Sequence, residues 1–182
     1  TIALSKADLQ DPSAMAEFRA VYEGAGYRVL EVSATEGVGV KAVCELLEGR
    51  VTLLSGNSGV GKSTLIHAIA PSLDIRTGEI SDSHHKGRHT TTFSTMYPLA
   101  EGGAVIDTPG IKGFGLLDID DAELWHYFPE MMRVAPGCRF YNCTHTHEPG
   151  CAVVEAVKAG EIAWSRYESY LKILDDDEKY RK

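Results

Sequence analysis

The sequence is poor in three features whose absence excludes whole classes of protein. None of its apolar runs is long enough to cross a bilayer, so no membrane contact is predicted. Basic residues are scarce: 18 Lys and Arg stand against 26 Asp and Glu, and a net charge of −8 excludes a generally basic nucleic-acid binder. No secretory signal is recognisable at the start, so a cytoplasmic location is expected.

Cysteine is scarce as well. Four cysteines in 182 residues do not make the framework of a disulfide-rich protein, and three of them crowd into residues 138–151, which is typical of a metal site. The chain is nevertheless 43% hydrophobic, enough to bury one core with a small appendage.

Strand and helix signals alternate through the first two thirds of the chain. Strands are predicted at residues 1–4, 27–32, 51–55, 93–99 and 104–107, and helices at 13–24, 40–47 and 62–70. This alternation predicts a mostly parallel sheet with helices on both faces. Beyond about residue 120 only helices are predicted, at 124–132, 152–158 and 162–174, followed by a charged, solvated tail at 175–179.

The stretch VTLLSGNSGVGKST has the strongest chemical signal. Gly56, four further residues, and then Gly61, Lys62 and Ser63 fit the phosphate-binding loop, with a predicted strand before it and the helical LIHAIA after it. Glycines let successive N–H groups point at phosphate oxygens. Lys62 would reach the β- and γ-phosphates, and the Ser63 hydroxyl would bind Mg²⁺. An ordinary glycine turn before a helix is the alternative, which this context disfavours.

A second element, GGAVIDTPGIKGFG, places Asp107 at the end of an apolar strand. A carboxylate there can hold a Mg²⁺-bound water, and the Gly110 N–H can approach a γ-phosphate oxygen. Asp-Thr-Pro-Gly alone is better interpreted as an ordinary turn. Because the same chain also has the phosphate-loop motif, the functional interpretation of Asp107 and Gly110 is favoured.

The opening TIALSKADLQ suits recognition of guanine. The Asp8 carboxylate can accept two N–H bonds from the base edge, and the stem of Lys6 can pack along the ring. In the segment EVSATEG, Ser33 and Ala34 follow a predicted strand, where a backbone N–H can meet the guanine carbonyl oxygen. These two elements normally follow the phosphate loop in GTPases. Here they precede it, so the motif order is circularly permuted.

With these motifs the chain resembles the circularly permuted ribosome small-subunit-dependent GTPases, the RsgA/YjeQ family. The matching segments are SKADL, SATEGVG, SGNSGVGKSTL, GRHTTT, DTPGIKGFG, CRFYNCTHTHEPGC and RYESYLKIL. The resemblance implies hydrolysis of GTP to GDP and phosphate, activation by the small ribosomal subunit, binding to its rRNA, and a role in its late maturation. It also implies an N-terminal RNA-binding OB-fold domain, which this sequence is expected to lack. Ser5 departs from the Asn of most GTPases and the Thr frequent in this family.

The polar segment 81–95 is predicted to be a switch loop. A threonine there, Thr91 in preference to Thr90, would complete the Mg²⁺ shell only when the γ-phosphate is present. Ile111 stands where many GTPases have a water-positioning Gln. The resemblance implies that His89 orients the attacking water instead; a solvent-exposed loop histidine is the alternative.

The candidate residues fall into three groups. The candidate GTP-binding residues are Ser5, Lys6, Asp8, Ser33, Ala34, Gly56, Asn57, Ser58, Gly59, Val60, Gly61, Lys62, Ser63, Thr64, Asp107 and Gly110. The candidate catalytic residues are Lys62, His89 and Thr91, and the expected Mg²⁺ ligands are Ser63, Thr91 and Asp107.

The cysteine cluster supplies a further set of candidate residues, for a second metal ion. Cys138, Cys143, His145 and Cys151 supply three thiolates and one imidazole, enough for a closed tetrahedral Zn²⁺ site with a structural role. His147 is the competing ligand, and similarity to the family favours His145. Reduced cysteines packed in a core without metal are the alternative.

The predicted fold class is therefore α/β: a circularly permuted P-loop GTPase domain over residues 1–118, followed by a small α-helical zinc-binding domain over 119–182. A monomer with one Zn²⁺, using Mg²⁺ with GTP, is expected. Two other functions stay open: a permuted GTPase acting on another RNA or protein partner, and a zinc-stabilised interaction module whose nucleotide site is only structural. Lys6 and Asp8 disfavour an ATPase.

Overall fold

A computed structural model describes residues 1–73, 94–109 and 119–180, with side chains as far as residue 175. The chain divides into two compact units. The first consists of Thr1–Met15 and Val29–Phe114, and the second of Ala16–Arg28 and Gly115–Lys182. Segment 16–28 thus groups with the C-terminal part of the chain, and the division at 118/119 stays a prediction. Among the described residues, no helix combines the length and apolar character that crossing a membrane requires.

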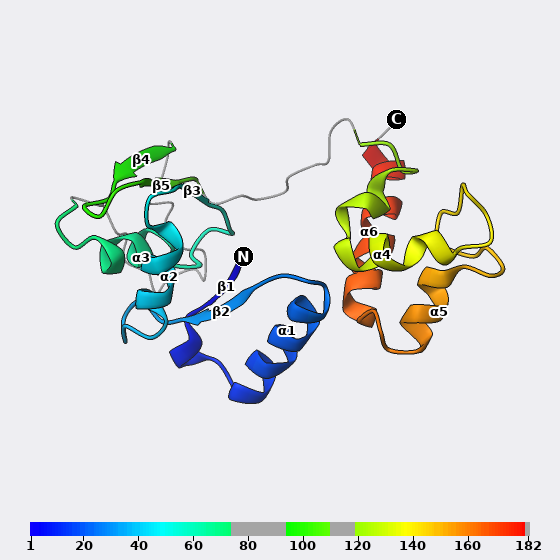
Figure 1. The fold of residues 1–182 in the computed structure, drawn as a ribbon, viewed down its shortest axis with the longest axis horizontal. Helices are drawn as coiled ribbons and strands as arrows, with labels where there is room; N and C mark the ends of the chain where they lie inside the picture. Colours follow the sequence, from blue (N-terminus) through cyan, green and yellow to red (C-terminus); the bar gives the residue numbers. More distant parts are fainter. Residues whose placement is uncertain (74–93, 110–118, 181–182) are drawn as a thin grey trace. The chain divides into compact units, whose positions relative to one another are not determined.

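The strands of the first unit form two hydrogen-bonded sheets (Figure 1). Strand β1 (Ile2–Ser5) pairs in parallel with β2 (Val29–Val32). The other sheet has the order β3-β5-β4, with β3 (Val51–Leu54) parallel to β5 (Ala104–Asp107) and β4 (Thr95–Pro98) antiparallel to it. The carboxyl ends of the parallel strands β3 and β5 therefore lie at the same edge of their sheet. The carboxyl ends of β1 and β2 lie at the same edge of the other sheet.

The helices that precede β4 in the chain are the 3₁₀ helix η1 (Ala7–Leu9), α1 (Pro12–Gly24), α2 (Val40–Leu47) and α3 (Lys62–Ile69). Most of α1 belongs to the second unit, and the other three belong to the first. Glycine is required before α2, because Gly39 has φ 70° and a Cβ there would lie 2.2 Å from the carbonyl oxygen of Glu31. A buried cluster then forms from Val32, Val43, Leu47 and Leu65.

The second unit is helical. Its C-terminal part comprises η2 (Leu124–Tyr127), α4 (Pro129–Val134), η3 (Ala135–Gly137), α5 (Ala152–Lys158) and α6 (Trp164–Tyr180). The single helix predicted at 124–132 is wrong. Phe128 is extended before Pro129, whose ring disfavours the helical conformation in the preceding residue. Helix α6 also continues through the acidic run that was predicted to be a tail.

The core of the second unit surrounds the cysteine cluster. Its fully buried members include Met131, Val153 and Tyr170, and Phe128 packs edge-on against the Tyr170 ring. Cys143 and Cys151 belong to the same buried cluster. The metal-site candidates are therefore part of the core rather than attached to its surface.

Candidate functional site

The loop between β3 and α3 has the curled backbone that phosphate binding requires. Gly59 and Gly61 adopt positive φ angles of 81° and 95°, and Gly61 is the N-cap of α3. This left-handed geometry is strained for residues with side chains, which explains the glycines. Successive N–H groups and the positive end of α3 can therefore face one anion.

Lys62 lies over this loop. Its Nζ donates to the carbonyl oxygens of Gly56 at 2.8 Å and Asn57 at 3.1 Å. An ammonium group has three N–H donors, so one remains for a phosphate oxygen. Ser58 and Val60 are half-buried in the loop, whereas Thr64 is exposed on α3.

Two of the three predicted Mg²⁺ ligands lie together, Ser63 at the start of α3 and Asp107 at the end of β5. The Ser63 hydroxyl donates to Oδ2 of Asp107 at 2.9 Å, and Asp107 is 1% exposed. The next residue, Thr108, donates from its hydroxyl to the carbonyl oxygen of Leu54 at 2.7 Å, which ties the ends of β5 and β3 together. A hydroxyl and a buried carboxylate at this spacing are a hard oxygen donor pair that fits Mg²⁺.

The guanine-recognition candidates lie at one edge of the β1–β2 sheet, because Ser5 pairs with Val32 in parallel register. Lys6 has left-handed backbone angles of 57° and 42°, which turn the chain into η1, where Asp8 is exposed. The Ser5 hydroxyl donates to the carbonyl oxygen of Val60 at 2.6 Å. The β1 end is therefore hydrogen-bonded to the phosphate loop.

Ser33 begins a tight turn after β2. Its N–H donates to the carbonyl oxygen of Val38, and its buried Oγ accepts from the N–H of Glu36 at 3.2 Å and contacts the Thr35 hydroxyl at 3.1 Å. Ala34 is half-buried in this turn. The serine side chain fixes the turn, which leaves the backbone of Ala34 as the group available to a base.

Three predicted site residues, His89, Thr91 and Gly110, lie outside the described residues, as do Thr90 and Ile111. The switch loop and the candidate water-orienting histidine therefore stay predictions.

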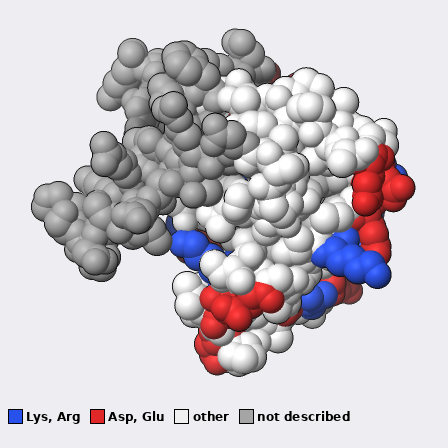
Figure 2. Space-filling view, turned by 90° about the vertical axis from the view of Figure 1, so that its left-hand side faces the viewer, with Lys and Arg blue, Asp and Glu red and all other residues white. Residues whose placement is uncertain are grey.

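The described surface carries charge of both signs. In the face drawn in Figure 2, Lys and Arg side chains lie beside Asp and Glu at the right and lower parts of the described surface, next to a large uncharged area, and the described residues form no continuous basic patch in this view. This agrees with the net charge of −8.

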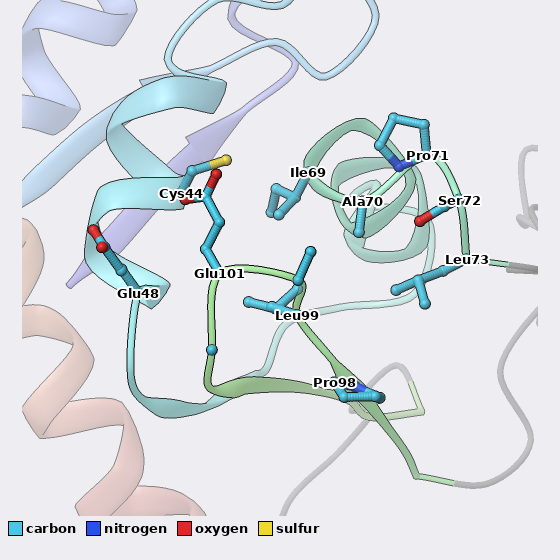
Figure 3. A pocket seen from close by; sticks show the side chains of 12 residues that line it. Cys44, Glu48, Ile69, Ala70, Pro71, Ser72, Leu73, Pro98, Leu99 and Glu101 are labelled. Atoms are coloured by element: carbon cyan, nitrogen blue, oxygen red, sulfur yellow. The ribbon is translucent and has the colours of Figure 1, made fainter.

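A hollow of about 220 Å³ lies in the first unit, away from the phosphate loop (Figure 3). Its walls come from the ends of α2 and α3 and from the β4–β5 turn, with Cys44, Ile69, Leu99 and Glu101 among the lining residues. Burial and the nearby Glu101 carboxylate raise the pKa of Cys44. The thiol stays protonated at neutral pH and is a poor nucleophile.

In the second unit, Cys138, Cys143, His145 and Cys151 present one ligand atom each, all within 4.8 Å of one another. Nδ1 of His145 lies 3.5 Å from the Sγ atoms of Cys138 and Cys151, which are 4.0 Å apart. A tetrahedral zinc with ordinary bond lengths needs ligand separations of roughly 3.5–3.8 Å. The distances from Nδ1 of His145 to the two Sγ atoms match this range, and the other ligand atoms lie within 4.8 Å, so the group could hold a metal ion with Nδ1 as the histidine ligand.

The protonation chemistry of the cluster also suits a metal. Burial raises the pKa of Cys143 to about 12 and lowers the pKa of His145. The imidazole is therefore neutral, and a bound cation would displace protons from the thiols. His147 lies outside the cluster: it is exposed, and its Nδ1 contacts the Thr146 hydroxyl at 2.8 Å.

Sequence reasoning missed the residues that shape the metal loop. The Glu148 carboxylate accepts from the N–H and hydroxyl of Thr144 and from the N–H groups of Thr146 and His147. Burial raises the pKa of Glu148, but these hydrogen bonds outweigh it and hold the pKa well below its usual range. A charged carboxylate thus organises the loop, which no spacing in the sequence indicates.

Two tyrosines of α6 hold the same loop from the other side. The Tyr167 hydroxyl donates to the carbonyl oxygen of His145 at 2.7 Å, and the Tyr170 hydroxyl donates to that of Thr144 at 2.6 Å. His145 has a positive φ of 58°, an uncommon conformation for a non-glycine residue. The spacing of Tyr167 and Tyr170 in the sequence does not indicate these hydrogen bonds.

Comparison with known proteins agrees with this geometry. The sequence profile of the RsgA GTPase family matches residues 1–117. The chain is 59% identical over 167 residues to the small ribosomal subunit biogenesis GTPase RsgA of Porphyromonas gingivalis, covering 89% of this chain and 53% of that protein. It is 56% identical to RsgA 2 of Bacteroides thetaiotaomicron, covering 88% of this chain and 53% of that protein.

Solved structures show the same fold. YjeQ from Thermotoga maritima superposes with a TM-score of 0.79 at 38% identity, covering 97% of this chain and 59% of that one. YloQ, described as a circularly permuted GTPase, superposes with a TM-score of 0.75 at 27% identity, covering 99% of this chain and 57% of that one. The chain spans about half the length of the relatives it matches.

Proposed function

The chain belongs to the RsgA GTPase family, and on that premise we propose that it hydrolyses GTP to GDP and phosphate. The observation that carries the proposal is the hydrogen bond of 2.9 Å from Ser63 to the buried carboxylate of Asp107, at the edge where the phosphate loop begins. Two oxygen donors at a glycine-rich anion cradle are the arrangement that hydrolysis of a Mg²⁺-bound nucleotide requires.

The protein contributes positioning and charge stabilisation. The N–H groups of residues 59–62 and the Lys62 ammonium would bind the phosphates, and Ser63 and Asp107 would hold Mg²⁺ directly or through its water shell. When bound, Mg²⁺ neutralises charge that develops on the phosphate oxygens. Thr91 would join this shell in the GTP state, and His89 would orient the attacking water.

Guanine selectivity would come from Lys6, Asp8 and the turn at Ser33 and Ala34. The parallel pairing of β1 and β2 supports this role, because it places both elements at one edge of a sheet. The hydrogen bond from Ser5 to Val60 supports a joint site for base and phosphates.

We further propose that the small ribosomal subunit and its rRNA are the partners, that the chain acts there as a monomer in the cytoplasm, and that Zn²⁺ is the ion of the cysteine cluster. The names of the relatives, small ribosomal subunit biogenesis GTPases, support the proposed partner, and the ligand separations in the cysteine cluster support the proposed ion. The cluster offers four ligands and no open position, which favours a structural role.

The test is phosphate release from GTP, measured with and without purified small ribosomal subunits, for the unmodified chain and for His89→Ala. The proposal expects slow intrinsic turnover, stimulation by the subunit, and loss of that stimulation in the variant. Turnover that is absent under every condition, with GDP binding intact, would instead favour a structural nucleotide site.

A further inference from the structure

The two guanine-recognition elements are joined by residues 9–32, and the middle of this connection belongs to the second unit. Asp8 lies just before it and Ser33 just after it, while Ala16–Arg28 groups with the helical zinc-site unit. The connection consists of α1, a turn at 25–28 and the four-residue strand β2. Any freedom in the turn therefore lies only a few residues from Ser33.

Arg133, on α4, holds the end of α1. Its two Nη atoms donate to the carbonyl oxygens of Gly24 at 2.6 Å and Ala25 at 3.2 Å. These carbonyls belong to the C-terminal turn of a helix, where acceptors lack partners within the helix. The next residue, Gly26, has φ 98°, and a Cβ there would lie 3.0 Å from Nη1 of Arg133. The guanidinium therefore packs closely against the turn.

Arg166, on α6, holds the aromatic residues of the same turn. Its guanidinium lies over the rings of Tyr22 and Tyr27, at 5.8 and 5.9 Å, and over Phe128 at 4.8 Å. Its Nε donates to the carboxylate of Glu130 at 2.6 Å, and Glu130 is 2% exposed. A planar cation stacked on several rings and paired with a buried carboxylate has one preferred position.

We propose that Arg133 and Arg166 are positioning residues for guanine recognition. This rests on the proposed GTP-binding function and adds a dependence of base selectivity on the second unit. The two guanidinium groups order the connection between Asp8 and Ser33 before nucleotide binds. Nucleotide binding then does not have to order this connection, so no conformational entropy is lost there on binding. The affinity for the guanine nucleotide is higher as a result.

The proposal makes a prediction specific to the base. Asp8 would accept from the 2-amino group of guanine, which inosine diphosphate (IDP) lacks. A misplaced Asp8 would weaken GDP binding more than IDP binding, whereas damage to the phosphate loop would weaken both equally. The ratio of the two affinities therefore separates base positioning from a general loss of structure.

The experiment measures GDP and IDP affinity by calorimetry for the complete chain, Arg133→Gln, Arg133→Lys and Arg19→Gln. Arg133 is exposed and pairs with carbonyls rather than with a buried charge, so its substitution leaves no buried carboxylate unpaired. Arg19→Gln is the matched control, because it removes an arginine on α1 whose Nη1 pairs with Glu23 at 3.2 Å. Metal content and helical content are measured for each variant.

We expect Arg133→Gln to weaken GDP binding about 5- to 10-fold and to reduce the preference for GDP over IDP, with metal content unchanged. The GDP affinity of Arg133→Lys should lie between those of Arg133→Gln and the unmodified chain. Arg19→Gln should change neither the GDP affinity nor the IDP affinity. An unchanged GDP-to-IDP ratio in Arg133→Gln would overturn the positioning role. If the unmodified chain itself failed to prefer GDP, the guanine selectivity of the proposed function would fail together with the inference.

Discussion

The nucleotide site and the metal cluster are built in opposite ways. The described residues of the proposed nucleotide site come from four separate segments within residues 5–107, whereas the candidate metal ligands lie within residues 138–151. Much of the phosphate loop is backbone at the surface, while Cys143, His145 and Cys151 are buried side chains. The nucleotide site therefore depends on strand register, and the metal cluster depends on one loop and the helices around it.

This difference predicts how each site fails. A local cluster of buried ligands is lost when its ion or one ligand is lost, because the same atoms are part of the core. A site assembled from separate strand ends keeps its framework when one side chain is removed and loses only that group's contribution. Four substitutions or treatments, taken from the largest expected effect to the smallest, test this contrast.

Metal removal should have the largest effect. Chelation, or Cys151→Ala, should abolish stoichiometric zinc and the cooperative unfolding of the second unit, because structural zinc contributes on the order of 10 kcal/mol to folding. Metal analysis and thermal unfolding followed by circular dichroism measure both. Cys44→Ala is the control, since Cys44 belongs to the first unit and is not a member of the cluster. Full helicity after complete metal loss would contradict a structural metal.

Lys62→Ala should have the next largest effect, confined to the other site. The ammonium lies over the phosphate loop, bonded to Gly56 and Asn57. Loss of a charged donor to phosphate should lower GTP affinity about 100-fold, while zinc content stays unchanged. Calorimetric titration measures the affinity, with Lys41→Ala on the exposed surface of α2 as the control. Loss of zinc in Lys62→Ala would contradict the independence of the two sites.

Predictability from the sequence follows the same contrast. The short motifs predicted the family and the fold class, and the comparisons confirm both. The helices at 40–47 and 152–158 and the strand at 104–107 have the bounds predicted for them. The division of the strands into two sheets and the contacts of Arg133 and Arg166 were not predictable, because they join residues more than a hundred positions apart or depend on tertiary packing.

Within the metal loop, prediction from the sequence fails for a different reason. The four ligands are recognisable because their chemistry is unusual, but Glu148 resembles any exposed glutamate in a sequence. Its role emerges only when the loop folds and its carboxylate meets the N–H groups of Thr144, Thr146 and His147. Residues that position others are therefore harder to predict than the ligands themselves.

Glu148→Gln tests that role and should have an intermediate effect. Glutamine keeps the size of the side chain but replaces one acceptor oxygen with a donor, which cannot accept the loop N–H groups. Zinc affinity should fall about 10- to 100-fold, with GDP affinity unchanged. Competition with a chromophoric chelator measures the zinc affinity. Glu155→Gln is the matched control, an exposed glutamate paired only with Lys158 at 2.9 Å in the described structure. Equal zinc affinity in the two variants would contradict the positioning role.

Ser5→Ala should have the smallest effect and tests the one described hydrogen bond between the β1 end and the phosphate loop. Its hydroxyl donates to the carbonyl oxygen of Val60 at 2.6 Å, and one such neutral bond contributes about 1 kcal/mol. GDP affinity should therefore fall less than tenfold, and Ser5→Thr, which keeps the hydroxyl, should restore it. Ser169→Ala, which loses a comparable bond to the Ser165 carbonyl on α6, should leave GDP affinity unchanged. A loss far beyond tenfold in Ser5→Ala would show that the nucleotide site, like the metal cluster, depends on a single local contact.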